Sequence, residues 1–105
     1  MTAVAIDSKA IMVEAYSLIY DIETTLKHLL YSKLYLHHFH NNETYNKILN
    51  LVEMNDLLSF SDTQYETLRK THSIRNKVCH MRSISQEDLA LLKEVHHLLE
   101  STSKH

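Results

Sequence analysis

The chain contains neither glycine nor proline at any of its 105 positions, and this absence restricts the folds open to it. Tight β-hairpins are built on Asn-Gly, Asp-Gly or Gly-X corners, so a meander, sandwich or barrel would lack its usual turn residues. The loops that cradle phosphate in P-loop and dinucleotide-binding enzymes need glycine at fixed positions. Both enzyme classes are therefore excluded, and an all-β fold is not expected.

The composition is that of a folded domain, because 44% of the residues are hydrophobic and 23% are charged. The length suits one domain over residues 1–105, with residues 101–105 as a frayed tail. No apolar run has the length of a membrane span, and the N-terminus carries acidic residues where a signal peptide would be basic. We therefore expect a cytoplasmic protein that does not contact a membrane.

Four stretches show the apolar spacing of amphipathic helices, which predicts an all-α fold. The first stretch runs from about Ser8 to about Tyr35, with Ser8 or Asp7 as its N-cap. The second follows an N-cap at Asn42 and ends near Met54. Both expected N-caps are residues whose side chains accept hydrogen bonds from the first helical N–H groups.

The third and fourth helices are each predicted to begin at a capping box. Ser61 with Gln64 opens the third, whose apolar stripe continues to Met81, and Ser85 with Asp88 opens the fourth. Short connections between the helices predict an antiparallel four-helix bundle. The apolar faces of the first and last helices exceed what a small bundle must bury, which favours a homodimer.

Positive charge is concentrated in one segment, although the net charge of the whole chain is -2. The twenty residues from Thr67 to Gln86 contain five basic residues and no acidic one, whereas the rest of the chain has six basic and thirteen acidic residues. This distribution indicates an anion site on the third helix, and the alternative is a solvated helix face. The candidates for contact with RNA or phosphate, besides Arg75, are Arg69, Lys70, Lys77 and Arg82.

The sequence RNKVCH lies within this basic segment. Asn76 and His80 are four residues apart on one helix face, so the Asn76 amide can orient the His80 ring. Arg75 offers a planar fork of donors for a phosphate, but it lies roughly 140° from His80 around an ideal helix. Arg75 and His80 converge only if Arg75 reaches around, the helix ends at His80, or a second copy supplies the partner. An acid/base, an orienting group and a guanidinium suffice in kind to cleave RNA through its own 2'-hydroxyl without a metal.

The residues Arg75–His80 resemble the R-x4-H motif of the HEPN superfamily (higher eukaryotes and prokaryotes nucleotide-binding). The sequence ETTLKHLL at 23–30 is similar to the Glu-x-x-Leu-Arg/Lys stretch of that family's first helix. The sequence HMRSISQEDLALL resembles the loop and capped helix that follow the motif histidine. The likeness spans most of the chain and implies the four-helix HEPN fold.

The resemblance also implies a function, that of a metal-independent endoribonuclease in a toxin–antitoxin or phage-defence system. Dimers of the family bring two motifs together in a composite cleft, so the implied partners are RNA, a second copy and a cognate antitoxin or other defence protein. By this likeness His80 is the general acid/base, Arg75 binds the phosphate and the transition state, Asn76 orients, and Glu23 is a candidate partner for Arg75. The alternative is a non-catalytic HEPN module that binds nucleotide or RNA or regulates another protein.

Two further groups of residues suggest other chemistry and are set aside. His37, His38 and His40 could catch a metal, but no cysteine or spaced carboxylate pair completes a site, so we expect no metal and no cofactor. Cys79 adjoins His80, but neighbouring helical residues point about 100° apart, which argues against a thiol nucleophile. We expect Cys79, the only cysteine, to be a buried structural residue.

The first predicted helix is rich in tyrosine. Its four tyrosines form two pairs spaced four residues apart, so each pair shares a helix face. Such a stripe is more often part of a core or a dimer interface than a platform for base stacking, and we expect an interface. The residues concerned are Tyr16, Tyr20, Tyr31 and Tyr35.

Overall fold

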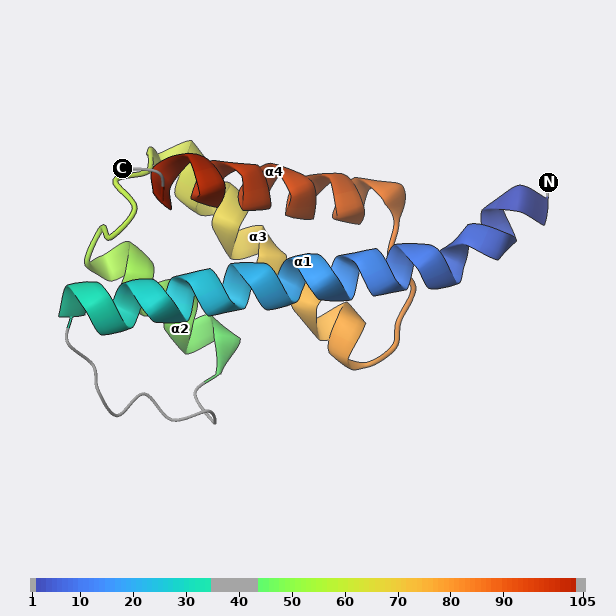
Figure 1. The fold of residues 1–105 in the computed structure, drawn as a ribbon, viewed down its shortest axis with the longest axis horizontal. Helices are drawn as coiled ribbons and strands as arrows, with labels where there is room; N and C mark the ends of the chain where they lie inside the picture. Colours follow the sequence, from blue (N-terminus) through green and yellow to red (C-terminus); the bar gives the residue numbers. More distant parts are fainter. Residues whose placement is uncertain (1, 35–43, 104–105) are drawn as a thin grey trace.

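The computed structural model describes residues 2–34 and 44–103, and every regular element in that part of the chain is a helix (Figure 1). The helices are α1 (Thr2–Leu34), α2 (Tyr45–Met54), α3 (Asp62–Cys79) and α4 (Gln86–Ser103). The predicted all-α fold is confirmed. α1 is the spine of the molecule and contacts each of the other three helices. None of the described helices combines the length and the apolar character needed to span a bilayer.

The antiparallel arrangement is not what the structure shows for α1 and α4, which lie side by side and run in the same direction (Figure 1). Two ion pairs establish the direction, because residue numbers rise together on the two helices. Lys93 lies 3.3 Å from Glu14, and His96 lies 3.3 Å from Asp21. Short connections constrain only consecutive helices, and the connection between α1 and α2 is longer than a tight turn.

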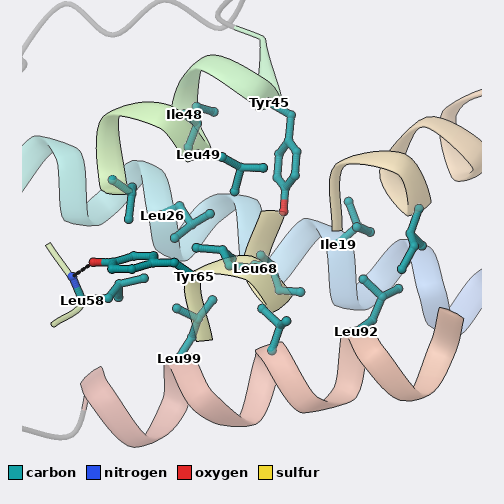
Figure 2. Close-up of a cluster of buried hydrophobic side chains, with 14 of the residues drawn as sticks. Ile19, Leu26, Tyr45, Ile48, Leu49, Leu58, Tyr65, Leu68, Leu92 and Leu99 are labelled. Carbon is teal, nitrogen blue, oxygen red and sulfur yellow. Dashed lines mark hydrogen bonds between the residues drawn. The ribbon is translucent and has the colours of Figure 1, made fainter. Parts of the chain in front are cut away.

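The core is a single cluster to which all four helices contribute (Figure 2). α1 supplies its central stripe at steps of three and four residues, and α4 supplies a matching stripe. Burial of each large aliphatic side chain contributes about 1.5–3 kcal/mol, so this shared stripe is the main source of stability. The buried residues of α1 and α4 are Ala15, Ile19, Ile22, Leu26, Leu30, Leu89, Leu92, Val95 and Leu99.

Both predicted capping boxes are present. Ser61 N–H donates to Gln64 Oε1 at 2.9 Å, and Gln64 N–H donates to Ser61 Oγ at 3.2 Å. At the start of α4, Ser85 N–H donates to Asp88 Oδ2 at 3.2 Å, and Asp88 N–H donates to Ser85 Oγ at 3.0 Å. These caps satisfy N–H groups that have no partner within the helix, and they position the connection between α3 and α4.

Three helix boundaries differ from the prediction. α1 begins at Thr2 and not after Ser8 or Asp7, because nothing in the preceding residues interrupts a helix. The N-cap of α2 is Thr44, whose hydroxyl accepts from Lys47 N–H at 3.2 Å, while Asn42 lies outside the described residues. α4 continues to Ser103, so residues 101–103 are helical where fraying was expected.

Two helices end in a motif that normally uses glycine. After α2, Asp56 has φ 47°, Asp56 N–H donates to Glu53 O, and Leu57 N–H donates to Val52 O. These two bonds define a Schellman motif, in which the residue of positive φ is usually glycine. Asp56 is suited to this position because aspartate tolerates positive φ, and its carboxylate accepts from the Tyr65 hydroxyl at 2.7 Å.

The end of α3 has the same motif with a less suitable residue. Met81 has φ 58°, Met81 N–H donates to Val78 O at 3.2 Å, and Arg82 N–H donates to Lys77 O at 2.7 Å. Met81 was predicted to continue the apolar stripe of α3, and this is wrong, because the helix ends at Cys79 and Met81 is 81% exposed. The chain therefore holds an apolar side chain in solvent beside His80.

We expect Met81→Gly to stabilise the fold by about 1 kcal/mol, because it removes the cost of positive φ for a residue with a β-carbon. Urea denaturation measures the free energy of unfolding. Asp56→Gly is the matched control and should not stabilise, since it also removes the hydrogen bond to Tyr65. A Met81→Gly protein no more stable than the unaltered chain would contradict the prediction.

Candidate functional site

The RNKVCH motif occupies the C-terminal end of α3, where the Schellman motif stops the helix. His80 is the C-cap residue, and its backbone N–H donates to Asn76 O at 3.0 Å. His80 and Asn76 are both exposed. Among the described residues no hydrogen bond joins the Asn76 amide to the His80 ring, so the orienting contact that the spacing predicts is not formed in one chain.

Arg75 lies on a different side of α3, against α1 and α2. Its Nε is 3.4 Å from Glu23 Oε1, and the other carboxylate oxygen of Glu23 is 3.3 Å from Lys27 Nζ. The guanidinium carbon of Arg75 lies 5.5 Å from the centre of the Tyr45 ring, an arrangement that allows a cation–π interaction. The Arg75 side chain remains 30% exposed. Contacts from two other helices therefore hold the guanidinium in place, while part of the side chain stays open to solvent.

The ring beneath Arg75 is itself fixed by a buried polar contact. Tyr45 Oη and Thr71 Oγ1 are 2.8 Å apart, and Thr71 Oγ1 donates to Leu68 O at 2.6 Å. Because the Thr71 proton goes to Leu68, Tyr45 is the donor in the contact between the hydroxyls. Desolvation by burial raises the pKa of Tyr45 to about 12, so its hydroxyl keeps its proton at neutral pH.

The structure does not bring Arg75 and His80 together within one chain. The helix does end at His80, which was one of the three ways in which the two could converge, but Arg75 is directed toward Glu23 and Tyr45. No hydrogen bond or ion pair joins Arg75 to His80 in the described part of the chain. In one chain, Arg75 and His80 therefore do not form a joint site.

The other four predicted anion-binding residues divide into two pairs. Arg69 forms an ion pair with Glu53, and Lys77 Nζ lies 2.9 Å from Asp88 Oδ2. Lys70 and Arg82 are exposed, and neither makes an ion pair with a side chain of residues 9–34 or 44–102. Lys70 and Arg82 are therefore better placed than Arg69 and Lys77 to meet a phosphate backbone.

A groove separates the middle of α1 from the end of α3. Its volume is about 440 Å³, and Arg75 is one of the residues that line it. His80 is outside the lining, but both of its neighbours in the sequence, Cys79 and Met81, are inside it. Cys79 is exposed, which corrects the expectation of a buried cysteine, because it is the last residue of α3 and lies beyond the packed stripe. The lining consists of Tyr16, Ile19, Tyr20, Glu23, Thr24, Lys27, Arg75, Val78, Cys79 and Met81.

The sequence pattern did not connect Tyr16 and Tyr20 with Arg75, although all three line this groove. A signal was present, because Tyr16, Tyr20, Glu23 and Lys27 follow one another at helical spacing and so share one face of α1. Only the packing of α3 against that face shows that Arg75 lies opposite. Tyr31 belongs to neither wall of the groove, and Tyr35 lies outside the described residues.

A larger hollow and the histidine cluster add no further site residues. The hollow, of about 750 Å³, is lined by the connection between α2 and α3, the start of α3 and the C-terminal parts of α1 and α4, and its lining includes none of the predicted site residues. His37, His38 and His40 lie outside the described residues. Within the described ranges no three histidine, cysteine or acidic side chains are grouped to hold a metal ion.

No protein-family model, curated protein or solved structure matches the chain.

The support beneath Arg75 can be tested by removing each hydroxyl. Thr71→Val leaves the buried Tyr45 hydroxyl without its acceptor and should cost about 1–3 kcal/mol, whereas Tyr45→Phe should cost about 0.5–1.5 kcal/mol because Thr71 keeps its bond to Leu68. Urea denaturation of both variants and of the double variant gives the coupling between the two residues. Strictly additive losses would show that the contact contributes nothing.

Asp88 gives stability a dependence on pH. Burial acts to raise the pKa of Asp88, but the hydrogen bonds from Lys77 and from Ser85 N–H outweigh it and hold the pKa below its usual value. A lowered pKa in the folded state means that the stabilisation is present above the ordinary aspartate range and is lost as the pH falls through the folded pKa.

We therefore expect Asp88→Asn to lower the free energy of unfolding at pH 7 by about 1 kcal/mol or less, because the pair with Lys77 is partly exposed. The difference from the unaltered chain should shrink below about pH 4 as Asp88 takes up a proton. Denaturation between pH 3 and pH 7 measures this difference. Glu87→Gln, in the same helical turn, is the control, and an effect of Asp88→Asn that does not vary with pH would refute the assignment.

Proposed function

We propose that the chain is a metal-independent endoribonuclease of the HEPN type, acting in a toxin–antitoxin or phage-defence system. The observation that carries the proposal is the placement of its motif at the exposed end of α3. There His80 is open to solvent, and Arg75 is held by Glu23 and Tyr45 while part of its side chain remains exposed. Lys70 and Arg82, which are exposed and make no ion pair among the described side chains, lie on the same segment and favour a polyanion.

The chemistry uses side chains alone. The His80 imidazole takes the proton of a ribose 2'-hydroxyl, the 2'-oxygen attacks the adjacent phosphorus, and the bond to the 5'-oxygen breaks. The Arg75 guanidinium binds the phosphate oxygens that gain charge in the transition state. A protonated imidazole returns a proton to the leaving 5'-oxygen. The products are a 2',3'-cyclic phosphate and a free 5'-hydroxyl.

A homodimer completes this site in the proposal. Arg75 and His80 lie on different sides of α3, so two copies that meet at the ends of α3 would offer two histidines and two arginines to one phosphate. The exposed apolar side chain of Met81 is at this end and supports such a contact. A cognate antitoxin or other defence protein would then act by covering the same end of α3.

The second candidate function is a non-catalytic module that binds RNA or nucleotide, or regulates another protein. It is favoured by two observations, the ion pair that already compensates Arg75 and the missing contact between Asn76 and the His80 ring. Such a module would bind RNA with a strong dependence on salt and would not cleave it.

Cleavage of a labelled single-stranded RNA in the presence of EDTA tests the proposal. We expect His80→Ala to lower the rate by about 10²- to 10⁴-fold, the usual contribution of a general acid or base. Arg75→Lys should also lower it, because lysine lacks the planar fork. His97→Ala, which removes an exposed histidine of α4, is the matched control and should leave the rate unchanged. Equal rates for the unaltered chain and His80→Ala would exclude His80 catalysis.

Induced expression in a bacterial host tests the biological role. The unaltered chain should arrest growth, and His80→Ala should not, provided that immunoblots show equal amounts of both proteins. Growth arrest by both proteins would point to the binding module, since binding does not need the imidazole. The absence of arrest by either protein would argue against the toxin role.

A further inference from the structure

The groove between α1 and α3 has walls suited to a nucleobase. We infer that it binds one unstacked base of a single-stranded RNA, with Tyr16 and Tyr20 as the stacking surface and Arg75 opposite them. The inference rests on the proposed function in one respect only: the phosphate next to this base is taken to be the one that is cleaved. The groove itself belongs to one chain and needs no second copy.

The two tyrosines form an exposed aromatic wall. Tyr16 is 61% exposed and Tyr20 is 62% exposed, whereas tyrosine is on average intermediate in burial. They are four residues apart on α1, so both side chains belong to the same helix face. Between them and α3 the floor is apolar, formed by the buried side chains of Ile19 and Val78.

The polar groups of the groove suit a base attached to phosphate. Arg75 and Lys27 place two cations in the lining, and Glu23 lies between them within 3.4 Å of both. Aromatic faces combined with arginine are the usual surface for single-stranded nucleic acid, because each base has a π-face and each nucleotide carries a negative charge. The Glu23 carboxylate can accept a hydrogen bond from an amino or imino group of the base.

The position of the groove connects it with the proposed chemistry. Cys79 and Met81 line its end, and His80 lies between them in the sequence. A base seated against the tyrosines therefore places its sugar and phosphate beside the end of α3. Paired bases of a duplex are stacked on their neighbours and cannot enter such a groove without unpairing, so the ligand class is single-stranded RNA. The volume of about 440 Å³ is within the range of small-ligand sites.

The experiment measures binding without turnover. A fluorescently labelled single-stranded oligonucleotide with 2'-O-methyl groups throughout lacks the attacking hydroxyl, so it reports binding by the unaltered chain whether or not the chain is a nuclease. Fluorescence anisotropy gives its Kd, and a duplex of the same length serves as the second probe. The variants are Tyr16→Ala, Tyr20→Ala and the corresponding phenylalanine changes, with Val13→Ala as a control on α1 that is 60% exposed and outside the groove.

We expect each alanine variant to weaken single-strand binding by about 10-fold, as for the loss of one stacked base, and each phenylalanine variant to keep it. Val13→Ala should bind like the unaltered chain, and the duplex should bind more weakly. Unchanged affinity in both alanine variants would overturn the inference. A failure of the unaltered chain to bind the oligonucleotide would also overturn it. Alanine variants that change the oligomeric state measured by sedimentation, and not the affinity, would do the same, because the groove would then be a contact with a second copy.

The two proposals fail in different ways. If binding depends on the tyrosines and no cleavage depends on His80, the base-binding groove is supported and the nuclease proposal is wrong. If cleavage depends on His80 and neither tyrosine affects it, the nuclease proposal is supported and the base-binding groove is wrong.

Discussion

The burial of the apolar stripe of α1 is the constraint on which the rest of the structure depends. α1 contacts each of the other helices, and residues such as Ile22, Leu26 and Leu30 are fully buried by them. A side chain of α1 is therefore placed in the molecule by its angular distance from that stripe. Tyr16, Tyr20 and Glu23 all lie on the face beside this stripe, where Glu23 reaches Arg75 and the two tyrosines remain exposed.

The lack of glycine has a structural consequence beyond the exclusion of sheets and phosphate loops. Helices in this chain must still end, and two of them end through residues other than glycine at positive φ. Asp56 has a hydrogen-bonded carboxylate that suits the position, whereas Met81 has no such compensation and projects into solvent. The less favourable ending is the one beside His80, where the structure departs most from what local preferences alone would select.

The capping boxes and the fold class were predictable, because both depend on interactions within a few residues. Ser61 with Gln64 and Ser85 with Asp88 form the expected bonds. Spacing also placed Arg75 and His80 on different sides of one helix. The start of α1 and the exposure of Cys79 were predicted wrongly. In the first case, no N-cap residue in the sequence indicates where α1 begins. In the second, α3 ends at Cys79, although the apolar spacing of its sequence continues to Met81.

The sequence by itself determined that this chain is helical, where α3 and α4 begin, and which segment carries the positive charge, because helix capping and periodicity are local properties of the chain. Only the tertiary structure decided that α4 runs parallel to α1, that Glu23 and Tyr45 hold Arg75, and that Tyr16 and Tyr20 share a groove with it. These features join residues far apart in the sequence, and they depend on how four apolar faces share one core.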